Sequence, residues 1–322
     1  IFIGALLSGG YRSVFNRWFL AGAIVAALFT IPDVWWQATN HWPTISMTRQ
    51  LNQENGGLGE ISTWVVGQLI MVTLALIWVW IAGLRFLWRS NRPLWRALVW
   101  AYGILFVFFA LTTGAKIYYL AGAYVYLLAA GAVAVDGWLS ARHGRYRNLF
   151  ILIAVTTALS LPLVLPVLPG PDVGWTYGIN QVPGESIGWP ELVHTVRAAW
   201  FALPPEQRAR AVIFTGNYGE AGAINELGRG TGLPTAVSGH NNEWFWGPGN
   251  KNASTVLAVA PGPRDVTDYG GYLRRFFNDV RVVAVLSNTA GIHNQEWGGH
   301  VYVCTRPRRP WGKTWPEMRQ YS

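Results

Sequence analysis

The sequence contains little charge and almost no cysteine. Charged residues make up 13% of the 322 residues and hydrophobic residues 51%, which excludes a disordered chain, a coiled coil and the composition of an ordinary soluble enzyme. Cys304 is the only cysteine, so the chain can form neither an intramolecular disulfide nor a cysteine-based metal site. We therefore expect at least part of the chain to lie in a lipid bilayer.

Acidic residues are scarce, but the charge distribution argues against nucleic-acid binding. The chain has 25 basic and 16 acidic residues, a formal net charge of +9. From Asp172 onward, 14 basic and 12 acidic residues leave a net charge of only +2, so the excess lies in the apolar N-terminal half. Binding to nucleic-acid phosphates needs a surface rich in basic residues. The nearly balanced charge of the polar half does not predict such a surface. We expect a bilayer and no nucleic acid as partner.

Long apolar runs predict an α-helical multispanning membrane domain over residues 1–168. A helix needs about 20 mostly apolar residues to cross a bilayer core of about 30 Å. The predicted spans are residues 18–31, 61–84, 97–113, 117–139 and 149–168, and residues 1–8 resemble the remnant of a further span. No basic segment or initiating Met precedes Ile1, so we expect an N-terminally truncated chain.

The basic residues between these runs predict the orientation of the membrane domain. Nine of them flank one set of helix ends: Arg12, Arg17, Arg85, Arg89, Arg92, Arg96, Arg142, Arg145 and Arg147. Only Arg49 and Lys116 flank the other set. Because short cytoplasmic connections carry the excess of Lys and Arg, we expect residues 32–60, Lys116 and everything after residue 168 to be extracytoplasmic.

The polar C-terminal part predicts a small α/β domain. We expect a linker over residues 169–189, where prolines break the helix, and a domain over residues 190–322. The predicted strands are residues 210–214, 235–238, 255–260, 281–287 and 301–305, and the predicted helices are residues 191–203, 219–227 and 265–278. Strands that alternate with helices favour a partly parallel sheet.

Two extracytoplasmic segments of the membrane domain carry candidate binding residues. Lys116 precedes Tyr118 and Tyr119 in a tight connection, where an ammonium and two phenols suit a phosphate or pyrophosphate headgroup. Gln37 and His41 lie in a Trp-rich loop and could hydrogen-bond a polar substrate. For both segments a structural interpretation stays open, namely a snorkelling lysine and interfacial aromatic residues.

The tail offers a third candidate group, consisting of His240, Asn241 and Trp244. These residues combine hydrogen-bonding groups with an aromatic face, as sugar sites do, but a structural role for His240 stays open. No His, Asp or Glu grouping has the spacing of metal ligands, so no metal site is predicted and the need for a divalent cation stays open. No other cofactor is implied by the residues.

The sequence resembles bacterial family-39 glycosyltransferases in four segments that follow one another in the expected order. They are the Trp-rich residues 32–43, with Pro32, Trp36-Gln37 and His41-Trp42-Pro43, then Lys-Ile-Tyr-Tyr-Leu at 116–120, Asn-Tyr-Gly-Glu-Ala-Gly-Ala at 217–223, and Ser-Gly-His-Asn at 238–241 followed by the Trp-containing residues 244–248. These enzymes are similar to protein O-mannosyltransferases and to enzymes that transfer aminoarabinose to lipid A. The resemblance covers nearly the whole chain.

The resemblance implies a membrane glycosyltransferase of the glycosyltransferase C type that uses a polyprenyl-phosphate sugar as donor. Transfer goes to a protein, lipid or glycan acceptor on the outer face of the cell membrane, with inversion at the anomeric carbon. In relatives the catalytic acidic residue follows the first helix, which would lie before Ile1, so no residue here receives that role. Lys116 receives the donor-phosphate role, with Tyr118 and Tyr119 as weaker companions.

Two other functions stay open at this stage. A transporter or lipid flippase would place ionisable or helix-breaking residues along a path near mid-membrane, and Asp136 is the one acid within an apolar run. A noncatalytic membrane protein with a glycan-binding tail would use the Trp and His residues of the tail. The donor sugar, the acceptor and the oligomeric state are not predicted.

Overall fold

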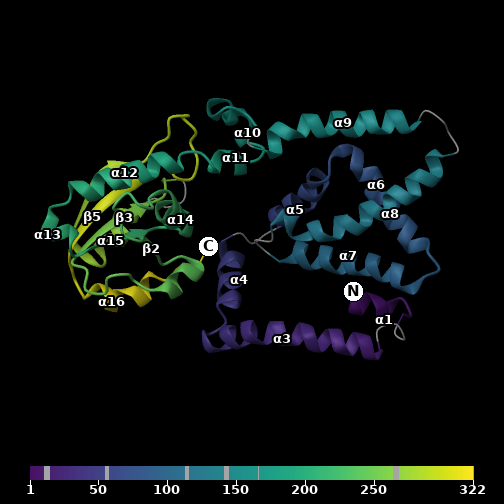
Figure 1. Cartoon of the computed structure of the whole chain (residues 1–322), viewed down its shortest axis with the longest axis horizontal. Helices are drawn as coiled ribbons and strands as arrows, with labels where there is room; N and C mark the ends of the chain where they lie inside the picture. The colour runs from purple at the N-terminus through teal and green to yellow at the C-terminus, as the bar shows by residue number, and fades with distance from the viewer. Residues whose placement is uncertain are drawn as a thin grey trace. The chain divides into compact units, whose positions relative to one another are not determined.

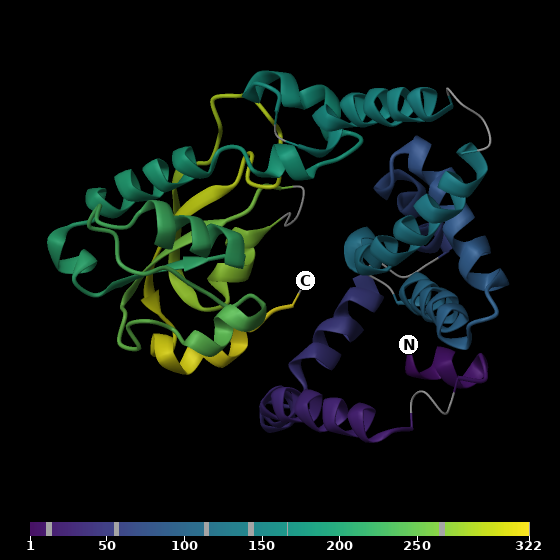
Figure 2. The ribbon, with the colours of Figure 1, turned by 45° about the vertical axis from the view of Figure 1, so that its right-hand side comes forward.

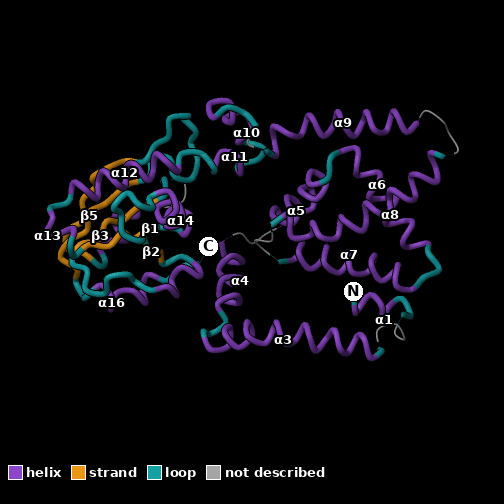
Figure 3. Tube along the Cα trace, viewed as in Figure 1, coloured by secondary structure: helices purple, strands orange, loops and turns teal. Residues whose placement is uncertain are grey.

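The computed structural model describes residues 1–10, 15–54, 58–112, 116–140, 145–165, 167–263 and 268–321. The chain divides into two compact units, residues 1–160 and residues 161–322. In Figure 3 the strands, drawn orange, all belong to the second unit, whereas the described part of the first unit consists of helices and loops. The fold thus joins a helical unit to an α/β unit.

The first unit contains helices of very different lengths. They are α1 (Phe2–Leu7), α3 (Arg17–Thr39), α4 (Pro43–Glu54), α5 (Leu58–Met71), α6 (Leu74–Arg89), α7 (Pro93–Leu111), the 3-10 turn η1 (Ile117–Leu120), α8 (Ala121–Leu139) and α9 (Arg145–Val164), which runs on into the second unit (Figure 1). Within the described residues, four segments are long and apolar enough to cross a membrane: Arg17–Thr39, Pro93–Leu111, Ile117–Leu139 and Arg145–Val164. The chain is therefore built to associate with a membrane.

The predicted span over residues 61–84 is wrong as a single helix. The structure breaks it at Val72 and Thr73 into α5, with 14 residues, and α6, with 16 residues. Thr73 has the extended backbone of an N-cap, and its carbonyl accepts a hydrogen bond from the Leu76 N–H at 2.7 Å. Each piece is shorter than the about 20 residues of a straight span.

The predicted loop over residues 32–60 is also wrong, because most of its described part is helical. Helix α3 continues through Pro32 and ends at Thr39, and α4 follows after a short corner. His41 and Trp42 form this corner in the left-handed region, with φ of 63° and 55°. Two left-handed residues in succession turn the chain sharply, so α4 follows α3 without a long connection.

Helix α6 packs closely against α8, and the contact depends on two glycines (Figure 1). A Cβ atom at Gly83 would overlap the carbonyl oxygen of Leu127, and a Cβ atom at Gly131 would overlap the carbonyl oxygen of Val79. Small residues at a helix interface let two membrane helices bring their backbones together, where dispersion and weak polar contacts add up. An aromatic cluster continues this contact, made of Trp64, Trp80, Tyr102, Phe106 and Tyr124.

The second unit is built around a five-stranded sheet in the order β2-β1-β3-β5-β4. The strands are β1 (Ala211–Thr215), β2 (Val237–Ser238), β3 (Thr255–Ala260), β4 (Phe277–Val285) and β5 (His300–Pro307). Strand β1 pairs in parallel with β2 and β3, whereas β5 pairs antiparallel with β3 and β4. The prediction of a partly parallel sheet is confirmed, and β3 has the predicted bounds.

Helices cover both faces of this sheet (Figure 2). One face packs against α12 (Trp189–Ala202) and α14 (Tyr218–Leu227) through residues such as Ile213 and Leu257. The other face packs against α15 (Tyr269–Arg274), α16 (Trp311–Thr314) and η4 (Trp315–Met318) through residues such as Phe214 and Ala258. Successive strand residues therefore alternate between two apolar cores.

Short helices occupy most of the remaining connections of the second unit. They are η2 (Gly170–Val173), α10 (Gly174–Tyr177), α11 (Val182–Glu185), α13 (Pro205–Arg208) and η3 (Asn241–Trp246). The first three lie in the segment that we expected to be a linker. The predicted helix over residues 265–278 is shorter than expected, because Phe277 already begins β4 and residues 265–267 lie outside the described residues.

Candidate functional site

The connection between α7 and α8 presents Lys116 and two tyrosines to the surroundings. Lys116 is the N-cap of η1 and its side chain is exposed. Tyr118 and Tyr119 follow it with exposed fractions of 60% and 48%, and their rings meet edge to face at 5.3 Å. The Tyr119 ring also lies 5.6 Å from the Phe109 ring of α7. The structure thus brings together three of the predicted residues; Thr113 to Ala115 lie outside the described residues.

Gln68 of α5 holds this connection in place from the buried side. Its side-chain amide nitrogen donates to the Ile117 carbonyl at 3.0 Å, and its amide oxygen accepts from the Tyr124 hydroxyl at 2.9 Å. Gln68 is only 1% exposed; its hydrogen bond with Tyr124 is buried, and the one with Ile117 is partly buried. A satisfied buried amide of this kind fixes the register of the elements it joins. Sequence reasoning missed Gln68, although an amide within an apolar run is a usable signal.

The electrostatics of the connection favour an anion. No carboxylate lies within salt-bridge distance of Lys116 among the described side chains. Lys116 also stands at the start of the continuous helical segment Ile117–Leu139, where unpaired N–H groups and the helix dipole favour negative charge. An ammonium and a helix N-terminus therefore act on the same region.

The structure places Gln37 and His41 in the corner between α3 and α4. The Gln37 amide donates to the Thr44 hydroxyl at 2.7 Å and accepts from the Thr44 N–H at 3.3 Å. Gln37 therefore joins the end of α3 to the start of α4. His41 is exposed, and its left-handed backbone makes the turn.

A second cluster of polar side chains lies at the carboxyl end of β1. Asn217 and Glu220 form a reciprocal capping box at the start of α14: the Glu220 N–H donates to Asn217 Oδ1 at 2.8 Å, and the Asn217 N–H donates to Glu220 Oε2 at 3.0 Å. Asn217 Nδ2 donates to Glu296 Oε1 at 3.2 Å. Open α/β sheets place ligands at this end of their parallel strands.

Glu220 and Glu296 form a buried pair of carboxyl groups. Glu220 is 0% exposed and Glu296 is 8% exposed. Burial raises the pKa of Glu220 well above its ordinary value, and the charge of Glu296 and a hydrogen bond with it raise the pKa further. Two neighbouring buried carboxyl groups cannot both ionise at low cost, so the arrangement favours a proton held by the pair. The pKa of the nearby Tyr269 hydroxyl is raised as well, first by burial and then by the charge of Glu220.

His240, Asn241 and Trp244 follow β2 in the sequence, and their environments differ. The His240 ring lies 4.8 Å from the Tyr218 ring, and its backbone N–H donates to the Ser238 hydroxyl at 3.2 Å. Asn241 has a left-handed φ of 52° at the start of η3.

Trp244 is held firmly by its neighbours. Its indole N–H donates to the Trp315 carbonyl at 3.0 Å, and the Arg319 guanidinium lies 4.5 Å from the ring centroid. One face of this indole is therefore occupied by Arg319. Of the three predicted residues of the tail, His240 contacts the capping-box segment, because its ring packs against Tyr218.

Sequence reasoning identified the segment that contains Asn217 and Glu220, but missed Glu296. Glu296 reaches the cluster from the loop before β5, far away along the sequence, and no local pattern predicts such a pairing. Within the described residues, no group of three or more His, Cys, Asp or Glu side chains is arranged to hold a metal ion. The cluster can therefore hold a proton at its carboxyl groups and offer the Asn217 amide for hydrogen bonding.

Comparison with known proteins adds no further constraint. A scan against protein-family models, a search of curated proteins and a search of solved structures each found no match. The described residues define a class of membrane-associated protein with an attached α/β unit.

Proposed function

We propose that the protein is a membrane glycosyltransferase of the glycosyltransferase C type that moves a sugar from a polyprenyl-phosphate donor to an extracytoplasmic acceptor. The observation that carries this proposal is the exposed ammonium of Lys116 at the start of the helical segment Ile117–Leu139. Lys116 would bind the donor phosphate, and Tyr118 and Tyr119 would donate hydrogen bonds to its oxygens.

The reaction makes specific demands on this site. The acceptor hydroxyl attacks the anomeric carbon, the bond from that carbon to the phosphate oxygen breaks, and the hydroxyl proton passes to a base. The base is not among the residues to which we assign a role. Negative charge grows on the departing phosphate, so a fixed ammonium stabilises the transition state more than the ground state.

The rigidity of the connection supports this role. Gln68 of α5 joins η1 and α8 through two hydrogen bonds of 3.0 Å and 2.9 Å, so the residues after Lys116 keep their place when a ligand arrives. A donor group that is already in position costs no reorganisation during the reaction. The α/β unit, with its polar cluster at the carboxyl end of β1, would bind or position the acceptor.

Substitution of Lys116 tests the proposal directly. Made in the protein as the cell produces it, Lys116→Ala should lower transfer from a polyprenyl-phosphate sugar in membranes by about 100- to 1000-fold, the range for removal of one oxyanion-stabilising group. Lys116→Arg, which keeps the charge, should retain much more activity than the alanine variant.

Lys313→Ala is the matched control, because Lys313 is an exposed lysine of α16 with no assigned role. Its turnover should equal that of the wild type. Unchanged turnover of the Lys116→Ala variant would show that Lys116 is not part of the site. An equal loss of turnover in the Lys313→Ala variant would show that the loss reflects a lower amount of folded protein.

One observation favours a second candidate function, a transporter or lipid flippase. The break at Val72 and Thr73 interrupts an apolar run, and discontinuous membrane helices commonly form the binding sites of transporters. Reconstituted liposomes distinguish the two functions: a transporter moves its substrate across the bilayer without forming a new glycosidic bond, whereas the glycosyltransferase forms the bond and needs no second compartment.

A further inference from the structure

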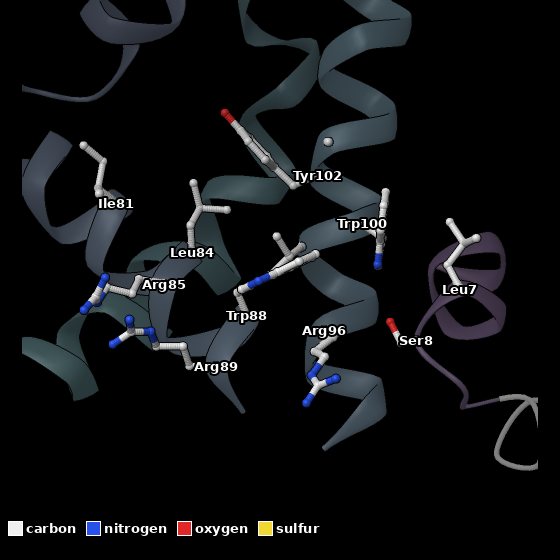
Figure 4. A pocket seen from close by; sticks show the side chains of 12 residues that line it. Leu7, Ser8, Ile81, Leu84, Arg85, Trp88, Arg89, Arg96, Trp100 and Tyr102 are labelled. Carbon is white, nitrogen blue, oxygen red and sulfur yellow. The ribbon is translucent and has the colours of Figure 1, made fainter. Parts of the chain in front are cut away.

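Two hollows flank a pair of arginines at the end of α6 in the first unit. The larger, of about 1110 Å³, is lined by residues of α1, α6 and α7 (Figure 4). The smaller, of about 620 Å³, is lined by residues of α6 and α8 and by Ser90 and Trp95. Arg85 and Arg89 line both hollows, and Figure 4 shows their side chains projecting from α6 in the same direction.

Among the described side chains, the arginines of these hollows have no acidic partner within salt-bridge distance. The described side chains of residues 1–160 form no salt bridge, and Arg85 and Arg89 are exposed. A third guanidinium belongs to Arg96 of α7, whose Nε donates to the Ser90 carbonyl at 2.8 Å, which fixes the side chain at the rim of the larger hollow. Three neighbouring positive charges attract an anion.

The walls of the larger hollow suit lipid chains. Trp88 and Trp100 stand in it with their rings 5.8 Å apart, and Leu7, Ile81 and Leu84 supply aliphatic surface. Tryptophan is typical of the level where acyl chains meet headgroups, and basic pockets between membrane helices bind anionic headgroups. The hollow therefore offers charge at one level and apolar surface beside it.

We propose that these hollows form a binding site for an anionic glycerophospholipid, separate from the Lys116 connection. The lipid phosphate lies at Arg85 and Arg89, with Arg96 at the rim, and the acyl chains lie along the apolar walls. The site binds lipid whether or not the protein transfers a sugar.

The experiment titrates phosphatidylglycerol into the purified, delipidated protein in detergent and counts bound lipid by native mass spectrometry. Each arginine near an anionic lipid contributes about 1 kcal/mol, which corresponds to about fivefold in Kd, so Arg85→Gln with Arg89→Gln should weaken binding by about 30-fold. The Arg85→Lys, Arg89→Lys variant keeps the charges and should bind within a few fold of the wild type.

The matched control replaces two other exposed arginines, Arg145 and Arg147 of α9, by glutamine. This variant loses the same charge, and its binding should be unchanged. An equal loss in the control would show general attraction to positive charge and overturn the site. Equal binding of phosphatidylcholine, or competition by glycerol 3-phosphate at the same concentration as the lipid, would overturn the assignment of an anionic lipid.

Discussion

Helix α3 and strand β3 show how differently the two units treat apolar side chains. Helix α3 has 23 residues and buries none of them, and Phe29 is 82% exposed. Strand β3 has six residues and buries all of them. In water such exposed apolar surface would drive association, whereas in lipid it is solvated. The first unit therefore leaves helix α3 exposed to lipid and packs its inner helices through close backbone contact and one aromatic cluster, whereas the second unit relies on burial of side chains along its strands.

The largest expected effect comes from the glycine contact between α6 and α8. Gly131→Leu should lower the stability of the helical unit by about 3 kcal/mol or more, because its side chain would collide with the Val79 backbone and force the helices apart. The midpoint of thermal unfolding in detergent, followed by circular dichroism, measures this loss.

Gly122 provides a control in the same helix. A Cβ atom at Gly122 meets nothing within 4 Å, so Gly122→Leu should leave the midpoint close to that of the wild type. Equal midpoints for the two variants would show that the unit does not depend on close approach of α6 and α8, and the contrast between the units would then be lost.

A smaller effect is expected at the buried carboxyl pair of the α/β unit. The raised pKa of Glu220 means that the folded state holds a proton that the unfolded state releases near pH 4.5. The free energy of unfolding therefore falls as the pH rises from about 4.5 through the folded-state pKa. Glutamine cannot titrate and still suits the capping box, so Glu220→Gln should abolish this part of the fall.

Cys304 provides the measurement for this prediction. It is buried in β5, and burial raises its pKa to about 12, so its labelling by a thiol reagent in urea reports unfolding of the α/β unit. We expect the free energy of unfolding of Glu220→Gln to fall less than that of the wild type on going from pH 4 to pH 8. Parallel pH profiles of the two proteins would contradict the shared proton.

The smallest effect is expected at an exposed acid of the same helix. Glu226 forms a salt bridge of 2.8 Å with Arg229, but both side chains are more than two-thirds exposed, at 71% and 74%. Exposed pairs contribute about 0 to 1 kcal/mol, so Glu226→Gln should change stability by less than about 0.5 kcal/mol at every pH. If Glu226→Gln showed the same pH profile as Glu220→Gln, burial of the carboxyl group would not be the cause of the pH dependence.

The sequence predicted the bounds of those elements that begin where polar residues give way to an apolar run. The span over residues 117–139 and the strand over residues 255–260 have the predicted bounds, because a lysine and a polar stretch mark where their apolar runs begin. The break at Val72 and Thr73 was not predictable, since both residues continue an apolar run and only tertiary packing shows that the chain turns there.

The candidate sites follow the same rule. Lys116, Tyr118 and Tyr119 are neighbours in sequence and remain together in the structure. Gln68 and Glu296 reach their clusters from other elements, so only the fold shows their part. Gln37 was predicted as a binding residue from its loop, but its amide is engaged with Thr44.

Cysteine accessibility tests the central claim, that Lys116, α4 and the α/β unit face away from the cytoplasm. Ile45, Asn91 and Lys251 are exposed, and the native Cys304 is buried, so single cysteines at the three positions report cleanly. We predict that an impermeant maleimide added to intact cells labels Ile45→Cys and Lys251→Cys, and labels Asn91→Cys only after permeabilisation. Labelling of Ile45→Cys and Asn91→Cys from the same side would contradict the account.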